Sequence, residues 1–279
     1  MKKVKAKRKF NTLNELGECP VYCDINNCFF WIDIIEKKLF CYNFSSNTLE
    51  MENLGFSCGS FCITTEGKLI FATDDGILLN YATKDETLIP IPDFDPALER
   101  INDGKCDPFG NFLFGSMDRM ENKSIGHFYR LSKNLSIEIL FDDIVISNGP
   151  AFSKDGRFLY FSDSFNQQIL RFPYSENSKL EREKCEVFYE FYGTDLAPDG
   201  LCVDNNNTLW VSIWGGYKVL GINDKKKIIY EVSVPTKNVT SCTFVKRKNM
   251  ELFITSARKG LEKVDLKFDQ DAGALFSAV

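Results

Sequence analysis

The sequence predicts an all-β fold, a six-bladed β-propeller built from four-stranded antiparallel blades. Three observations predict it: a loosely repeated segment, a repeat spacing of blade size, and the lack of any long stretch with helical periodicity. Six copies of the segment occur at spacings of 41 to 51 residues, and a four-stranded blade with its turns takes about 40–50 residues. The copies begin near residues 18, 59, 103, 148, 199 and 240.

The repeat reads as a polar residue, a glycine, a short apolar strand, a turn of Asp, Asn and Gly, and an aromatic-rich strand. It is clearest in residues 102–114, 147–162 and 198–212. Strands bounded by such turns are typical hairpin elements, and a parallel α/β fold is disfavoured because it needs helices between its strands. Residues 179–189 have a helix-like charge pattern, but at this point in the repeat we expect a long hairpin. We expect a single domain over residues 1–279.

Composition excludes several classes of function. The net charge of −5 gives no global support for a nucleic-acid partner. The basic stretch Met1–Phe10 is expected to form a solvated or edge strand rather than a targeting or nucleic-acid tail. No apolar run approaches the roughly 18 residues of a membrane span. No signal-peptide pattern and no Cys-x2-Cys pair accompanies the ten cysteines, so we expect reduced thiols, a cytoplasmic protein and a monomer or dimer.

The start of each repeat nominates candidate site residues. In a propeller the first strand of each blade lines the central channel, so the six starting residues should ring one mouth of it. Oxygen-bearing side chains that converge there would favour a bound cation, because clustered carboxylates repel one another. Turn formation is the alternative at any single position, and recurrence at equivalent positions favours a site. The six residues are Glu18, Gly59, Asp103, Asn148, Asp199 and Thr240.

Eight segments, in order along nearly the whole chain, resemble the gluconolactonase family, which includes regucalcin and the luciferin-regenerating enzymes. A single one of them would be weak, and their shared order makes the resemblance specific. They are residues 16–22, 100–111, 115–117, 147–156 continuing to Asp163-Ser164, 198–204, 213–216, 239–242 and 254–257.

The resemblance implies one divalent metal ion held by Glu18, Asn148 and Asp199, with Asp199 also as the proton-transferring residue. This ligand set is a subset of the ring that the repeat nominated. Oxygen ligands leave calcium, zinc, manganese and magnesium all open. A carboxylate beside a dication stays ionised near neutral pH and would act as a general base.

The resemblance also implies substrate contacts from Arg100 and Asn102. The repeat register nominates Asp103 instead, and we assign Asp103 an orienting role behind Asn102. Residues 118–125 are shorter and more charged than in animal members of the family, and Glu121 lies near the place of a substrate-contacting glutamate.

These features together predict a divalent-metal-dependent hydrolase that opens a sugar-acid lactone, such as an aldonolactone, with metal-activated water and Asp199 as base. The expected partner is a small-molecule lactone. His127 is the sole histidine. A site with a pair of histidines is therefore excluded, and a Ser-His-Asp hydrolase would have to use His127 as its base. Two alternatives stay open: an organophosphate-type esterase using the same metal pocket, and a non-catalytic calcium-binding propeller.

Overall fold

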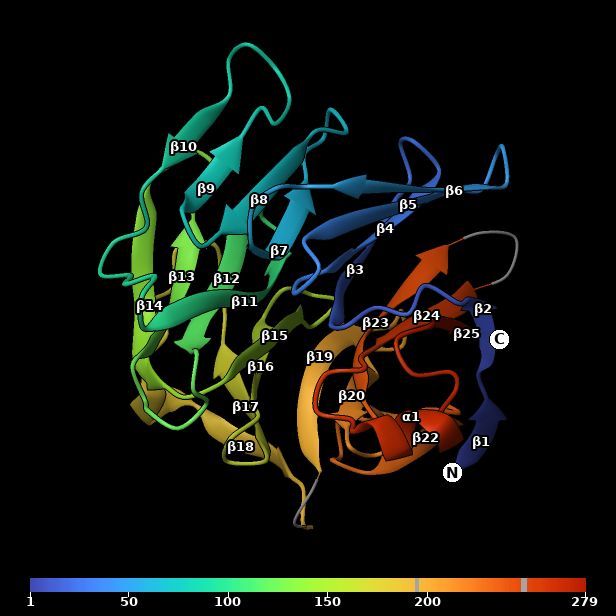
Figure 1. The fold of residues 1–279 in the computed structure, drawn as a ribbon. Coiled ribbons are helices and arrows are strands. Elements are labelled where there is room, and N and C mark those ends of the chain that lie inside the picture. The colour runs from blue at the N-terminus through green and yellow to red at the C-terminus, as the bar shows by residue number, and fades with distance from the viewer. Residues whose placement is uncertain (194–195, 247–249) are drawn as a thin grey trace. The chain divides into compact units, whose positions relative to one another are not determined.

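The computed structural model describes residues 1–193, 196–246 and 250–279. It divides into two compact units, one of residues 1–55 with 191–279 and the other of residues 56–190. Each unit contains three sheets with four antiparallel strands apiece (Figure 1). Six such sheets confirm the predicted fold class, a six-bladed β-propeller. The single-domain assignment of residues 1–279 stays a prediction.

The unit of residues 56–190 holds three consecutive blades, coloured cyan to yellow in Figure 1. In each blade the strands pair in chain order, as expected when consecutive strands are joined by short turns. Residues 179–189 lie in the connection between the last two strands and in the last strand itself, as the sequence predicted. The elements are β7 (Cys58–Ile63), β8 (Leu69–Thr73), β9 (Gly76–Leu79), β10 (Thr87–Ile89), β11 (Glu99–Cys106), β12 (Phe112–Asp118), β13 (Gly126–Leu131), β14 (Ile137–Ile144), β15 (Ser147–Phe152), β16 (Phe158–Asp163), β17 (Gln168–Pro173), the 3-10 helix η1 (Arg182–Lys184) and β18 (Glu186–Glu190).

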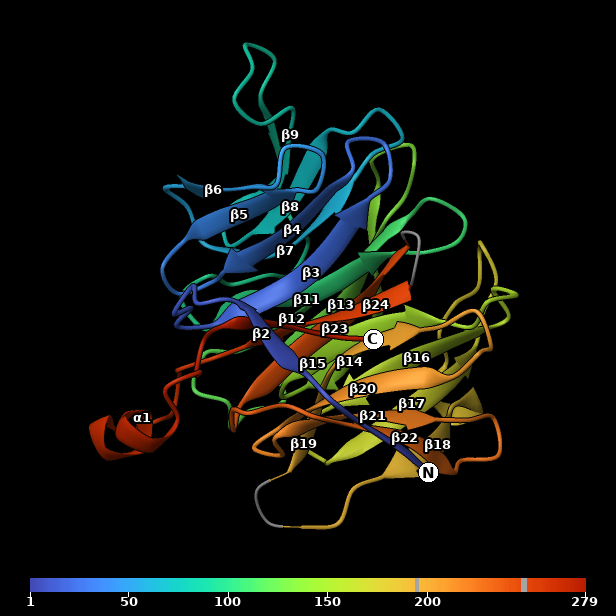
Figure 2. The same ribbon diagram turned by 90° about the vertical axis from the view of Figure 1, so that its right-hand side faces the viewer.

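The unit formed by the two ends of the chain holds the other three blades. Its α-helix α1 has six residues, none of them buried, and stands off the strands in Figure 2. Among the described residues, no helix is long and apolar enough to cross a membrane. The elements are β1 (Lys2–Lys5), β2 (Lys7–Phe10), β3 (Gly17–Cys23), β4 (Cys28–Asp33), β5 (Lys38–Asn43), β6 (Thr48–Asn53), β19 (Ala197–Val203), β20 (Leu209–Trp214), β21 (Lys218–Ile222), β22 (Ile228–Ser233), β23 (Val239–Lys246), β24 (Met250–Ser256), α1 (Lys263–Phe268) and β25 (Leu275–Ala278).

The basic N-terminal segment forms two edge strands, as predicted. β1 adds a fifth, parallel strand to the β19–β22 sheet, and β2 completes the β23–β25 sheet as its fourth strand. Lys3 pairs with Glu231 at 3.2 Å, and Arg8 pairs with Asp271 at 2.6 Å. Lysines along an edge strand discourage pairing with another chain, so the positive charge of this segment has a structural use.

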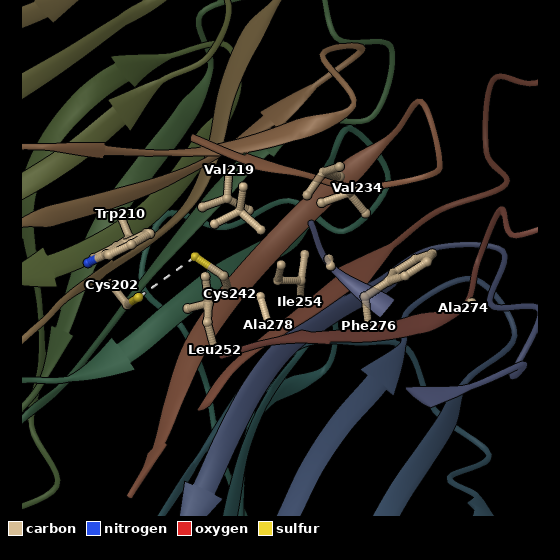
Figure 3. Packing of buried hydrophobic residues seen from close by; sticks show 13 residues of the cluster. Cys202, Trp210, Val219, Val234, Cys242, Leu252, Ile254, Ala274, Phe276 and Ala278 are labelled. Atoms are coloured by element: carbon tan, nitrogen blue, oxygen red, sulfur yellow. Dashed lines mark hydrogen bonds between the residues drawn. The ribbon is translucent and has the colours of Figure 1, made fainter. Parts of the chain in front are cut away.

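The apolar core between the β19–β22 and β23–β25 sheets is drawn in Figure 3. Val219, Ile254 and Phe276 are fully buried there. The Sγ atoms of Cys202 and Cys242 lie 3.7 Å apart within this cluster. No disulfide joins the ten cysteines, all of which lie among the described residues, and seven of them are buried. Their reduced state stays a prediction.

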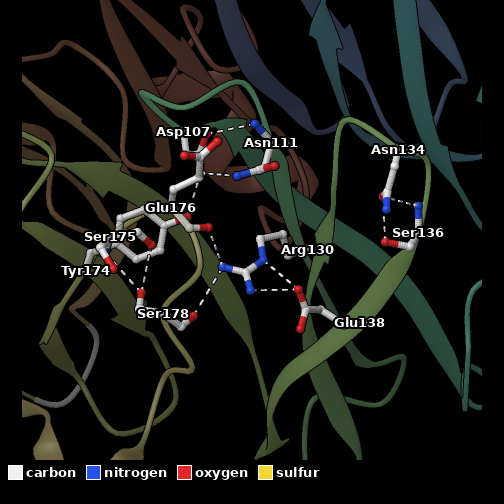
Figure 4. A network of polar contacts seen from close by, with 10 residues as sticks. All are labelled: Asp107, Asn111, Arg130, Asn134, Ser136, Glu138, Tyr174, Ser175, Glu176 and Ser178. Atoms are coloured by element: carbon white, nitrogen blue, oxygen red, sulfur yellow. Dashed lines mark hydrogen bonds and ion pairs between the residues drawn. The ribbon is translucent and has the colours of Figure 1, made fainter.

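A polar network joins the second and third blades of the unit of residues 56–190 (Figure 4). The buried guanidinium of Arg130, on β13, donates to Glu138 Oε1 at 2.8 Å and to the backbone oxygens of Glu176 and Ser178 at 3.1 and 3.2 Å. Tyr174 donates its hydroxyl to Asp107 Oδ2 at 2.7 Å. These bonds fix the loop after β17 against β13, because a buried guanidinium needs acceptors for its donors.

Candidate functional site

The first strand of every blade is interrupted at the position that the repeat nominated. In all six strands the pairing with the second strand shifts register over one or two residues, which is the signature of a β-bulge. A bulge leaves residues outside the ladder and turns their side chains to a new direction. The shifts fall between Glu18 and Val21, Cys58 and Ser60, Ile101 and Gly104, Asn148 and Ala151, Pro198 and Leu201, and Val239 and Cys242.

Within each unit these first strands approach one another very closely. A Cβ atom on Gly59 would lie 2.2 Å from the backbone oxygen of Ile101, and one on Gly200 would lie 2.0 Å from Ser241 Oγ. Real Cβ atoms do not come this near to other atoms, so only glycine fits at these two points. The close approach brings the bulge of one strand within hydrogen-bonding range of the next.

In the unit of residues 56–190, three of the predicted residues form a continuous chain of hydrogen bonds. Arg100 Nη1 donates to Asn102 Oδ1 at 2.6 Å, and Asn102 Nδ2 donates to Asn148 Oδ1 at 2.7 Å and to the backbone oxygen of Ser147 at 2.6 Å. Asn148 Nδ2 then donates to Ser164 Oγ at 2.9 Å. Asn102 and Asn148 are buried, and Arg100 is half-buried.

Asp103 occupies the same bulge as Asn102 but binds backbone. Its Oδ1 accepts from Gly104 N at 2.8 Å and its Oδ2 accepts from Gly149 N at 3.1 Å. Burial raises the pKa of Asp103 to about 6, against the opposing effects of Lys105 and of the two backbone donors. The carboxylate therefore ties the β11 bulge to the residue that follows Asn148.

The other two predicted ligands lie in the unit formed by the chain ends. Glu18 on β3 and Asp199 on β19 are each 5% exposed. Glu18 Oε2 accepts from Cys19 N at 3.2 Å, and Cys19 has a positive φ of 49°. Asp199 lies within the β19 bulge beside Gly200, whose hydrogen faces Ser241 of β23. Thr240 of β23 donates to the Gly17 oxygen of β3 at 2.5 Å, so the three first strands of this unit are linked in turn.

Glu121 lies in the tight turn that follows β12. Its N–H donates to the Asp118 oxygen at 3.1 Å, and its φ is +57°. Asp118 Oδ2 accepts from Asn122 N and Lys123 N, both at 2.9 Å, and these bonds lower the pKa of the Asp118 carboxyl. The backbone oxygen and the carboxylate of Asp118 thus hold the turn together.

Sequence reasoning missed the role of Ser164 and a buried cluster around Glu99. Ser164 belongs to one of the eight family-like segments, but nothing in its spacing pairs it with Asn148. Glu99 is buried and accepts from Ser116 Oγ at 2.5 Å, while His127 Nδ1 lies 3.4 Å from Glu99 Oε2. His127 lies on β13.

The predicted donor set fits a hard cation by its chemistry. It consists of two buried carboxylates and one amide oxygen whose orientation is fixed by hydrogen bonds, and calcium, magnesium and manganese prefer oxygen ligands of this kind. Among the described residues, no three His, Cys, Asp or Glu side chains form a cluster that could hold a metal ion. The predicted set has only two side chains of these types, Glu18 and Asp199, because its third member, Asn148, is an amide.

Comparison with known proteins places these features in a family. The chain is 30% identical to L-arabinolactonase of Azospirillum brasilense over 272 residues, which cover 96% of this chain and 89% of the relative. It is 28% identical to pig (Sus scrofa) regucalcin over 268 residues, or 93% and 89% of the two chains. Regucalcin from Agrobacterium tumefaciens, a calcium-binding protein, superposes with a TM-score of 0.91 at 27% identity, covering 99% of this chain and 95% of the other.

The profile of the SMP-30/gluconolactonase/LRE-like region matches residues 16–258. This range contains all eight segments that suggested the resemblance, and it holds every predicted site residue. The chain therefore belongs to the SMP-30/gluconolactonase/LRE-like family.

Proposed function

We propose that the protein is a lactonase that hydrolyses a sugar-acid lactone with the help of one divalent metal ion. The observation that carries the proposal is the set of buried Asn102 and Asn148 hydrogen-bonded to half-buried Arg100, in a chain similar over 96% of its length to an L-arabinolactonase. Burying polar side chains costs free energy of desolvation that their hydrogen bonds have to offset, so a buried polar set of this kind is consistent with a ligand-binding role. A lactone ring with hydroxyl groups suits such donors and acceptors.

We assign the metal to Glu18, Asn148 and Asp199. When bound, the ion would supply Lewis acidity toward the lactone carbonyl and the attacking water. Its identity among calcium, zinc, manganese and magnesium is part of the test.

Asp199 takes the proton as general base. The water oxygen adds to the lactone carbonyl carbon while its proton passes to the Asp199 carboxylate. The ring C–O bond then breaks, and the ring oxygen leaves as a hydroxyl that takes up that proton. No covalent enzyme intermediate is needed, which suits a site without a Ser-His pair.

Arg100 and Asn102 hold the sugar hydroxyls. The guanidinium of Arg100 carries five N–H donors in a planar arrangement, which suits the hydroxyl and carbonyl oxygens of such a ligand. We keep Asp103 in its orienting role behind Asn102, and Glu121 as a further candidate wall residue.

The decisive experiment is a lactone screen. Metal-stripped protein is supplied separately with calcium, zinc, manganese and magnesium, and assayed against a panel of aldonolactones. We expect ring opening that depends on the added metal and falls at least about 100-fold in Asp199→Asn, as is typical for loss of a general base. Asp224→Asn, an exposed aspartate of the same unit, is the matched control and should keep full activity.

The outcome against the proposal is a wild-type protein that opens no lactone with any of the four metals. Calcium binding without turnover would then be the better description, and the calcium-binding regucalcin neighbour favours it as the second candidate. Turnover of phosphotriesters but not of lactones would instead favour the organophosphate-type esterase.

A further inference from the structure

The hydrogen bonds from Arg100 to Ser164 run in one direction only. A guanidinium has donors but no acceptor, so Asn102 must present its Oδ1 to Arg100. The Ser147 backbone oxygen can only accept, so it draws the Nδ2 of Asn102 to the opposite side. Two independent partners therefore fix how the Asn102 amide is turned.

The orientation of Asn102 in turn fixes that of Asn148. Both N–H bonds of Asn102 are used, one toward Ser147 O and one toward Asn148 Oδ1. If the Asn148 amide turned over, two NH2 groups would face each other across 2.7 Å, and the Ser164 hydroxyl, which now accepts from Asn148 Nδ2, would have to donate to the amide oxygen instead. Ser164 and Asn102 thus hold the two ends of one amide.

We propose that Ser164 and Arg100 are positioning residues that act through Asn148, together turning its carbonyl oxygen toward the bound cation. This inference rests on the proposed metal site. An amide is a metal ligand only through its oxygen, so an amide free to turn over would offer that oxygen only part of the time. Partners behind a ligand typically contribute a factor of about 10–100 to metal affinity.

The surroundings of Ser164 support this role. Ser164 is 6% exposed and follows β16, the strand that pairs with β15, where Asn148 lies. Asp103 binds the N–H of Gly149 and so holds the backbone next to Asn148. Side chain and backbone of Asn148 are therefore fixed by different residues, and the side-chain anchor can be removed without touching the backbone one.

The test measures the equilibrium binding of calcium and of manganese to metal-stripped full-length protein by titration calorimetry. Ser164→Ala should bind each cation about 10–100-fold more weakly, and Ser164→Thr, which keeps the hydroxyl, should restore most of the affinity. Ser153→Ala is the matched control: it removes a buried serine of the same blade, whose Oγ bonds Asp155 rather than Asn148. Equal affinity in wild type and Ser164→Ala would overturn the inference and leave the proposed metal site standing.

Arg100→Met tests the other end of the series of hydrogen bonds that runs from Arg100 to Ser164. Position 100 should tolerate a substitution more readily, since Arg100 is half-exposed. Removing a positive charge should by itself tighten the binding of a cation, because like charges repel. Loss of the directional chain should weaken it instead. Weaker binding in Arg100→Met supports the positioning role, and equal or tighter binding overturns it. A wild-type protein that binds neither cation would contradict the metal site itself, which is a separate and recognisable failure.

Discussion

Asn102 donates its side-chain amide to Asn148 Oδ1 across 2.7 Å, and this bond joins the first strands of two neighbouring blades, β11 and β15. Both residues lie at β-bulges, where the ladder to the second strand is interrupted. A regular ladder would hold their backbones in line with their own sheets. The bulges turn the two amides toward each other and make a shared polar site between two blades.

We expect Asn102→Ala to lower the free energy of unfolding by about 1–3 kcal/mol, because Ser147 O and Asn148 Oδ1 both lose a buried donor. Urea denaturation measures the change. Asn206→Ala, at an exposed turn position, should change the unfolding free energy by less than about 0.5 kcal/mol. A stable Asn102→Ala protein with the wild-type midpoint would show that the hydrogen bonds contribute nothing to the fold.

Gly200→Ala should destabilise the protein by about 1–3 kcal/mol through overpacking. The added Cβ would lie 2.0 Å from Ser241 Oγ and 2.5 Å from Ser241 Cβ, so β19 and β23 would have to separate. The double variant Gly200→Ala with Ser241→Gly removes both of those atoms and should recover part of the loss. If thermal melting shows no recovery, the clash lies elsewhere.

Shortening the N-terminus should act in two distinct steps. Deletion of residues 1–5 removes only β1 and exposes the edge of β22, so we expect a small loss of stability and a greater tendency to aggregate. Deletion of residues 1–10 also removes β2 and Phe10, whose ring lies 4.8 Å from that of Tyr42. The longer deletion should cost about 2 kcal/mol or more beyond the shorter one.

Scanning calorimetry and light scattering of the two shortened proteins separate these effects. Equal melting temperatures for the two deletions would contradict the assignment of β2 as a structural strand of its blade.

Asp155 should contribute stability that depends on pH. Hydrogen bonds from Ser153 and Arg157 lower its pKa to about 2, below the value of about 3.9 expected in the unfolded chain. The folded state therefore holds this carboxylate charged more readily than the unfolded state does. Its contribution is fully present above about pH 4 and is lost as the pH falls toward 2.

The measurement compares wild type with Asp155→Asn in urea at several pH values. We expect the difference between their unfolding midpoints to be largest above pH 4 and to shrink as the pH is lowered. A difference that is constant with pH would mean that the charge of Asp155 does not matter.

The sequence by itself determined the six sheets and their order. Each repeat carries its own strand alternation and turn residues, so each hairpin is specified locally, and residues 18, 59, 103, 148, 199 and 240 all fall within the first strand of a blade. The basic N-terminus was predictable as an edge strand for the same reason. The ordered family-like segments also identified the family, since they span most of the chain.

Only the tertiary structure decided which polar groups meet. A β-bulge arises where one strand has an extra residue relative to the strand that it pairs with. The sequence of one strand alone does not show where that extra residue lies. The bond from Asn148 to Ser164 spans 16 residues and that from Asn102 to Asn148 spans 46, so no local sequence pattern predicts either hydrogen bond. The repeat in the sequence nominates candidate residues for the site, whereas the close approach of the first strands β11 and β15 brings Asn102 to Asn148.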